Sequence, residues 1–376
     1  MSASQRFPRR APWLASLLFA TAFAGCSFPL RESASGVRVV TAAPPSSREN
    51  YCAWYGTRDG DILYFGESAF WSTMRAGGGD PRADLEHPGP QPIGRLDLRT
   101  ESLLEPIEVG SPNSHSGVWD VLVSGSSLWY TTFFESAGRV DLAKGDVQRL
   151  PALGRGLNEW TQGPEQSVLV TRYGNGEARS GSVVMIDAAG ALRDEWLLPD
   201  PPDAVIAPKT PGWDAARSRL WLSSDALSRK AGTPIGNPTY ILDLANRSWQ
   251  RRDEPELQFV AFGPEGTGYR AQLRDRRLEL VVDPPEAPAR SILLDSNFPA
   301  AFDFVQDIQP GPDGRVVVTR WSGRLHLIGA TGKLRDIQLP RLVEGGLYYS
   351  AVLRGERVCA TYCAGVRVVC ANATRG

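Results

Sequence analysis

Residues 36–42 read GVRVVTA and residues 365–371 read GVRVVCA, so nearly the same heptapeptide opens and closes the main part of this 376-residue chain. Both stretches are rich in β-branched Val and begin with Gly, a composition typical of a strand that follows a turn. This duplication predicts that the two ends of the fold lie side by side in one sheet.

Apolar triplets recur between these two stretches, and most of them follow a turn that contains Gly or Asp. Successive triplets are mostly 40 to 52 residues apart, with one spacing of 66 residues. They lie at Ile62–Tyr64, Leu128–Tyr130, Val168–Val170, Leu220–Leu222, Val316–Val318 and Val358–Ala360, with a weaker one at Gly268–Arg270.

Most triplets are followed by a second strand-like segment that ends in a turn, such as GRLDLRTES (94–102) and GRVDLAKGD (138–146). The order predicts four short strands per unit, and no long window shows helical periodicity. Such a unit, repeated every 40–50 residues or so, indicates a β-propeller in which each unit is one blade. A β-sandwich or two stacked β domains is the alternative, but neither is expected to repeat this order along the whole chain.

We therefore predict an all-β fold, a seven-bladed β-propeller over residues 36–376. The last unit is short and ends after three strands, so Val37–Thr41 is expected to supply its fourth strand and close the ring. The extra length of the first unit lies at Thr73–Gly89, which is expected to form an inserted surface loop. The predicted units are residues 50–108, 114–151, 154–199, 205–255, 256–296, 299–340 and 345–376.

Four cysteines lie near the two ends of this fold, and an even number in an exported chain predicts two disulfides. Three pairings are possible, and the spacing matches no common zinc site. If Ala364-Gly365 is a two-residue hairpin turn, Cys359 faces Cys370, and Cys363 remains to reach Cys52. If Gly365 instead makes a three-residue turn, the register slips and this pairing fails.

The first 25 residues predict an export signal, because Arg6, Arg9 and Arg10 precede an apolar run too short to be a good membrane anchor. Residues 23–26 read FAGC and resemble the lipobox of bacterial lipoproteins, which implies a lipid on Cys26 and a tether over residues 26–35. Ser27, in place of an Asp that retains such proteins in the inner membrane, implies an outer-membrane lipoprotein. Periplasm and palmitate are expected for such a protein, and which leaflet or face it occupies stays open. A soluble secreted protein is the alternative.

Charge argues against a nucleic-acid partner. Without the three arginines of the leader, 38 basic residues stand against 42 acidic ones. Nucleic-acid binding calls for a basic patch or stripe. The expected partners are the membrane, through the lipid anchor, and an envelope protein, glycan or small ligand.

Functional residues are expected where the inner strands start, because loops at one mouth of a propeller channel carry function. Acidic and amide groups beside Trp suit a cation or a polar ligand held against aromatic faces. In the competing interpretation each Asp or Asn caps a tight loop and each Trp packs between blades. The residues expected there are Trp119-Asp120, Asn158-Glu159-Trp160, Trp213-Asp214, Phe302-Asp303 and Tyr348-Tyr349, with His115 and Lys209 in the preceding turns.

Three other side chains are candidates. His115, just ahead of the Trp-Asp pair, is the weak candidate for a general base. Arg172 and Arg320 end equivalent strands, where they could bind an anion or pair with an Asp of a neighbouring blade.

Two segments carry a family resemblance, GLNEWTQGPEQSVLVTRYGNG (156–176) and GWDAARSRLWLSSD (212–225). They resemble inner-strand segments of the gluconolactonase (senescence-marker), virginiamycin B lyase and NHL propellers. The gluconolactonase resemblance implies a divalent metal such as Ca²⁺, held by Asn158 and Asp214, with Glu159 or Asp120 as a third ligand. The gluconolactonase propellers differ from this chain, because they have six blades and carry a leading Glu motif that is not found here.

Two functions follow. The first is a lipid-anchored binding scaffold in the cell envelope. The second is a metal-dependent hydrolase or lyase of the gluconolactonase-like class, with its site at the channel mouth.

Overall fold

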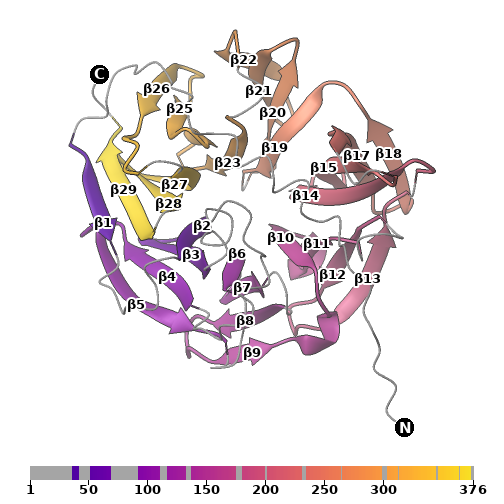
Figure 1. The fold of residues 1–376 in the computed structure, drawn as a ribbon, viewed down its shortest axis with the longest axis horizontal. Coiled ribbons are helices and arrows are strands. Elements are labelled where there is room, and N and C mark those ends of the chain that lie inside the picture. Colours follow the sequence, from indigo (N-terminus) through magenta and orange to yellow (C-terminus); the bar gives the residue numbers. More distant parts are fainter. Residues whose placement is uncertain are drawn as a thin grey trace.

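The seven predicted repeats are seven antiparallel sheets arranged in a ring (Figure 1). The structure is a computed structural model, and the residues it describes are 36–41, 51–68, 92–110, 117–132, 137–174, 180–199, 201–230, 234–263, 265–298, 303–311, 313–343, 346–363 and 365–373. The leader, Cys26, the tether, the loop at 73–89, Phe302 and His115 lie outside these residues. Within the described residues, no helix is long and apolar enough to span a membrane.

In blades 1 to 6 the main strands run in chain order from the centre of the ring outward (Figure 1). Blade 1 contains β2 (Cys52–Asp59), β3 (Ile62–Ser68), β4 (Pro92–Asp97) and β5 (Ser102–Glu108). Blade 2 contains β6 (Val118–Ser124), β7 (Ser127–Thr132), β8 (Ala137–Asp141) and β9 (Val147–Arg149). Blade 3 contains β10 (Leu157–Gln162), β11 (Val168–Arg172), β12 (Ser182–Ile186) and β13 (Leu192–Leu197). Blade 4 contains β14 (Ala204–Asp214), β15 (Arg219–Ser228), β16 (Pro234–Gly236), β17 (Thr239–Asp243) and β18 (Ser248–Arg252).

The last three blades complete the ring. Blade 5 contains β19 (Glu256–Phe262), β20 (Gly268–Arg274), β21 (Arg277–Asp283) and β22 (Arg290–Asp295). Blade 6 contains β23 (Val305–Pro310), β24 (Val316–Arg320), β25 (Arg324–Ile328) and β26 (Leu334–Gln338). Blade 7 contains β27 (Leu347–Arg354), β28 (Arg357–Cys363), β29 (Val366–Asn372) and, as its outer strand, β1 (Arg38–Thr41). The seven-bladed fold is as predicted.

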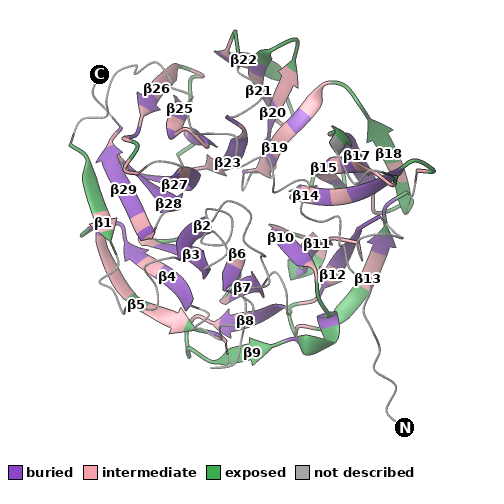
Figure 2. Cartoon of the chain, viewed as in Figure 1, coloured by how far each residue is buried: buried purple, intermediate pink, exposed green. Residues whose placement is uncertain are grey.

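The apolar triplets belong to the second strands of the blades. Both faces of such a strand pack on neighbouring blades, so apolar residues follow one another without alternation, as in the fully buried β24. The outer strands β9 and β18 are mostly exposed (Figure 2), and their sequences are accordingly rich in polar residues. The core therefore consists of layers between blades, for example Val317, Leu325 and Tyr348 between blades 6 and 7.

The ring closes where the duplicated heptapeptides meet. β1 pairs antiparallel with β29, with Arg38 opposite Cys370 and Val40 opposite Val368 (Figure 1). Arg357 also donates a hydrogen bond to the Gly36 carbonyl at 2.8 Å. The predicted closure by an N-terminal strand is confirmed.

Both predicted disulfides are present, Cys359–Cys370 and Cys52–Cys363. Cys363 pairs with Val366 across β28 and β29, which leaves the two-residue turn that sets Cys359 opposite Cys370. Gly365 has φ +79°, a conformation that suits Gly in such a turn. The second disulfide links the first strand of blade 1 to blade 7, across the closure.

Candidate functional site

Every inner strand carries an irregularity at the same distance from its end. The register between the first and second strand of each blade shifts three to five residues before the last residue of the inner strand. Such β-bulges re-aim side chains and are enriched near functional sites. We call the residues in these shifts the bulge ring: Trp54, Tyr55, Trp119, Asn158, Glu159, Thr210, Gln258, Gln306, Tyr349 and Ser350.

The bulge ring has an aromatic side. Blades 7, 1 and 2, which adjoin one another, contribute Tyr349, Trp54, Tyr55 and Trp119 (Figure 1). The Trp54 ring centroid lies 4.3 Å from that of Trp119 and 4.6 Å from that of Tyr349. Tyr55 and Trp119 keep partial exposure, whereas Trp54 and Tyr349 are buried. Aromatic faces are therefore available beside the central axis.

The other side of the ring is polar and comes from blades 3 to 6. Its members are Asn158, Glu159, Thr210, Gln258 and Gln306. The Tyr55 hydroxyl donates to Gln306 Oε1 at 3.1 Å and so joins the two sides. The ring thus has aromatic side chains on one side and hydrogen-bonding side chains, most of them buried, on the other.

The carboxyl groups of the inner strands connect neighbouring blades. Asp120 on blade 2 accepts the N–H of Trp160 on blade 3 at 2.7 Å, and its other oxygen accepts the N–H of Val121 at 2.8 Å. Glu159 on blade 3 accepts the N–H of Thr210 on blade 4 at 2.5 Å. Asp307 on blade 6 accepts the hydroxyl of Ser350 on blade 7. These acids hold the inner strands in register.

The carboxyl groups are also hard to ionise. Burial raises the pKa of Glu159 and of Asp307 to about 7, although both accept hydrogen bonds. Burial raises the pKa of Asp120 as well, with the nearby Glu159 carboxylate contributing. Acids whose pKa lies near neutrality are common at functional sites.

Thr210 adopts φ +38°, which is unfavourable for a β-branched residue. The bulge and the hydrogen bond to Glu159 hold it there, and its hydroxyl also bonds to Ser223. The backbone at this part of the ring is therefore strained, as is frequent where a site is preorganised.

Asn158 has an incomplete set of hydrogen bonds. Its Nδ2 donates to Glu159 Oε1 at 3.3 Å and to the Tyr173 hydroxyl at 3.0 Å. Its Oδ1 is buried and has no protein partner within the described chain, and the side chain has 0% exposure. The ionised form of Glu159 favours this amide orientation, because an oxygen in place of Nδ2 would face Glu159 Oε1.

Several predicted residues lie where expected. Trp119, Asp120, Asn158, Glu159 and Tyr349 are all at the start of inner strands. Lys209 lies inside β14, not in a turn before it, and its ammonium is 2.7 Å from Asp225 Oδ1.

The prediction that Trp213-Asp214 starts an inner strand is wrong. β14 begins at Ala204 and Asp214 is its last residue, about 13 Å along the strand from Thr210 at 3.3 Å per residue. There Asp214 pairs with Arg217 at 3.0 Å. Pro208 and Pro211 make the sequence look like a turn, but an inner strand has one free edge, where a missing N–H does not break the ladder.

The two arginines form ion pairs. Arg320 lies 2.8 Å from Asp295 of the neighbouring blade and also contacts Asp303, which matches the second of its two predicted roles. Arg172 pairs with Glu195 of its own blade at 3.0 Å.

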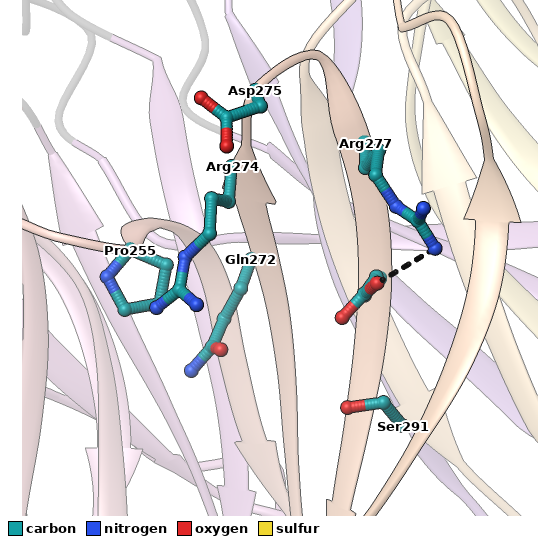
Figure 3. Close-up of a pocket in the computed structure, with 7 residues that line it drawn as sticks. Pro255, Gln272, Arg274, Asp275, Arg277 and Ser291 are labelled. Atoms are coloured by element: carbon teal, nitrogen blue, oxygen red, sulfur yellow. Dashed lines mark ion pairs between the residues drawn. The ribbon is translucent and has the colours of Figure 1, made fainter.

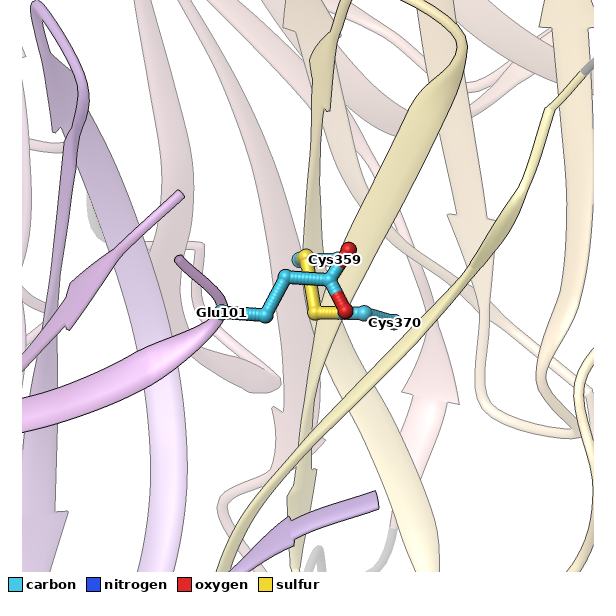
Figure 4. A group of neighbouring side chains, drawn as sticks. All are labelled: Glu101, Cys359 and Cys370. Atoms are coloured by element: carbon cyan, nitrogen blue, oxygen red, sulfur yellow. A yellow bond between two sulfur atoms is a disulfide. The ribbon is translucent and has the colours of Figure 1, made fainter. Parts of the chain in front are cut away.

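The residues implied for a metal are not all brought together. Asp214 is on the opposite face, and both oxygens of Asp120 accept backbone N–H groups. Asn158 and Glu159 remain side by side, and backbone carbonyls and water would have to supply most of the six to eight oxygen ligands that Ca²⁺ takes. In the described part of the chain, the one close group of three metal-ligating residue types is Glu101, Cys359 and Cys370 (Figure 4). There the sulfurs form a disulfide and Glu101 pairs with Arg357 at 2.5 Å.

A hollow outside the bulge ring lies on the face where the inner strands start, at the turn between β20 and β21 (Figure 3). It is a polar cavity of about 230 Å³. Its lining is Pro255, Gln272, Arg274, Asp275, Arg277, Glu279 and Ser291. Arg277 and Glu279 pair across it at 3.5 Å, so part of its charge is already neutralised.

Sequence reasoning missed Trp54, Tyr55, Gln258 and Gln306. A signal was present, since Trp54-Tyr55 and Gln306-Asp307 each place two consecutive large or polar residues where a strand should alternate. Such a break in period two within an inner strand indicates a bulge.

No family model and no curated protein matches this chain. Solved structures match it in fold. A catalytically inactive form of virginiamycin B lyase from Staphylococcus aureus, with quinupristin, is 13% identical with a TM-score of 0.60, over 89% of this chain and 99% of that one. YCF48 bound to D1 peptide is 11% identical with a TM-score of 0.55, over 92% of this chain and 99% of that one. The chain is thus a propeller similar to both in fold.

Proposed function

We propose that this protein is a binding module of the cell envelope that captures a peptide segment of another protein at the bulge ring. The observation that carries the proposal is the two-sided ring, in which Tyr55 and Trp119 are partly exposed and Tyr55 is hydrogen-bonded to Gln306 of the polar side. Aromatic anchors beside a few placed polar groups are the usual composition of a binding site. The peptide bound by YCF48 supports a peptide as the occupant here.

The ring is tested with an array of short peptides probed with the full-length protein in detergent. Wild-type protein should bind a subset of peptides, and Trp119→Ala and Gln306→Ala should each weaken that binding at least ten-fold. Leu197→Ala, an exposed residue of the outer strand β13, is the matched control and should bind like wild type. Thermal unfolding of each variant separates lost contacts from lost folding. Binding that ignores both ring substitutions would place the site elsewhere.

The location is part of the same proposal. A lipid on Cys26 would hold the propeller at the periplasmic side of the outer membrane, because two or three acyl chains anchor a protein stably. Labelled palmitate should be incorporated into the wild-type protein and not into Cys26→Ser. The wild-type protein should fractionate with the outer membrane, and a soluble wild-type protein would disprove the anchor.

A further inference from the structure

We propose that Asn158 and Glu159 bind the ammonium or guanidinium group of a basic side chain in the ligand. The inference rests on the proposed function and specifies its chemistry. It starts from Asn158 Oδ1, a fully buried acceptor without a protein partner in the described chain.

An unpartnered buried acceptor calls for a donor. Leaving such a group unsatisfied is unfavourable, and native proteins rarely do so. Both donor hydrogens of the Asn158 amide are engaged, toward Glu159 and Tyr173, so Oδ1 can be satisfied only by a group that brings its own N–H or O–H.

The surroundings select a positively charged donor. Lys209 has three carboxyl groups within electrostatic reach, those of Asp225, Glu159 and Glu256. It pairs closely with Asp225, at 2.7 Å, while Glu159 accepts hydrogen bonds from backbone and amide N–H groups. The carboxyl groups outnumber the cation, so a cationic ligand would offset their charge and favour the ionised form of the buried Glu159, whereas an anion would be repelled.

The aromatic side favours the same ligand. Tyr55 lies close enough to Glu159 for this carboxylate to contribute to the raised pKa of its phenol, after burial as the main cause. Tyr55 and Trp119 are the two partly exposed aromatic residues of the ring. A guanidinium or ammonium at Glu159 would therefore also be within electrostatic reach of Tyr55, and aromatic rings attract cations.

The test uses the peptides that the wild-type protein binds on the array. Binders should contain Lys or Arg, and replacing that residue by norleucine or citrulline should weaken binding at least ten-fold. Glu159→Gln keeps the shape and the acceptor for Thr210 and should also lose ten-fold or more. Asn158→Asp keeps an acceptor and should retain binding of basic peptides. Glu286→Gln, exposed on blade 5, is the matched control.

Three outcomes are separable. Basic binders that depend on Glu159 support the inference. Binders that need Trp119 and Gln306, but neither a basic residue nor Glu159, would overturn the inference and leave the proposed function standing. An array without any ring-dependent binder would overturn both. If Glu159→Gln unfolds, the norleucine and citrulline peptides still decide the question on wild-type protein.

Discussion

Glu159 combines structural and binding properties in one side chain. It holds blade 4 through the N–H of Thr210, and it borders the unpartnered oxygen of Asn158. Its pKa of about 7, raised by burial, means that its charge changes near neutral pH. If Glu159 only connected two blades, no unsatisfied acceptor such as Asn158 Oδ1 would be expected beside it.

The raised pKa predicts a pH-dependent stability. The folded pKa of about 7 lies above the ordinary 4.5, so the folded protein loses stability as pH rises from about 4.5 to about 7. A 2.5-unit difference corresponds to about 3 kcal/mol. Glu159→Gln removes this contribution, so its free energy of unfolding relative to wild type should rise by up to that amount between pH 4.5 and pH 8.

Urea unfolding at several pH values measures this difference. The control is Glu286→Gln at an exposed position, which should run parallel to wild type. Asp307 contributes a slope of its own in both proteins, since burial also raises its pKa to about 7. If the free energy of unfolding changed with pH in the same way for wild type and Glu159→Gln, the raised pKa of Glu159 would be contradicted.

The side-chain oxygens at Asn158 and Glu159 also predict the response to calcium. Of the four residues implied for a metal only Asn158 and Glu159 lie together, and Glu159 already accepts two N–H groups, so calorimetry after chelator treatment should show no stoichiometric binding at this ring. Glu159→Gln and Asp214→Ala, run in parallel, identify the residues if binding occurs. Tight one-to-one binding that Glu159→Gln abolishes would contradict this prediction and favour the hydrolase or lyase alternative.

At the scale of elements, the two disulfides differ in what they connect. Cys359–Cys370 links neighbouring strands of one blade, with a sequence separation of 11. Cys52–Cys363 spans a separation of 311 and packs against Trp54 and Tyr349 of the bulge ring. The second bridge therefore constrains both the closure and the aromatic side.

Removing each bridge should have a different effect. The loop-entropy model gives about 6 kcal/mol for the long loop and about 3 kcal/mol for the short one. Cys52→Ala with Cys363→Ala should lower the urea midpoint more than Cys359→Ala with Cys370→Ala. Only the first pair should change the near-ultraviolet circular dichroism of the packed Trp54 and Tyr349. Equal losses would show that the long bridge does not constrain the unfolded chain.

Sequence predicted elements better than it predicted the site, for a physical reason. Triplets such as Val316–Val318 predict strands because burial on both faces demands apolar residues at each position, and this demand is local. A bulge is defined by the register between two strands, so the orientation of Gln306 depends on which residues β24 sets opposite it. The prediction for Asp214 was wrong because Pro208 and Pro211 are typical turn residues. They lie inside β14, whose free edge tolerates proline.

At the scale of the whole molecule, closure creates the aromatic side of the ring. Tyr349 belongs to the last blade and Trp54 to the first, and their ring centroids are 4.6 Å apart. This contact between the two ends of the chain exists only in a closed propeller. β1 supports it by adding the fourth strand to blade 7, beside β29 (Figure 1).

Replacing residues 36–41 by a Gly/Ser segment of equal length should therefore affect both stability and assembly. The change removes the Val40 packing and the β1 ladder, so the free energy of unfolding should fall by about 2–3 kcal/mol. It also leaves β29 as an unpaired edge, which should promote concentration-dependent association. Urea unfolding and sedimentation measure the two effects.

Val39→Thr is the matched control, because Val39 is 41% exposed and Thr is a good strand former. This substitution should change the free energy of unfolding by less than about 0.5 kcal/mol. An unchanged midpoint together with a monomeric replacement variant would mean that the disulfide, and not the strand, closes the ring.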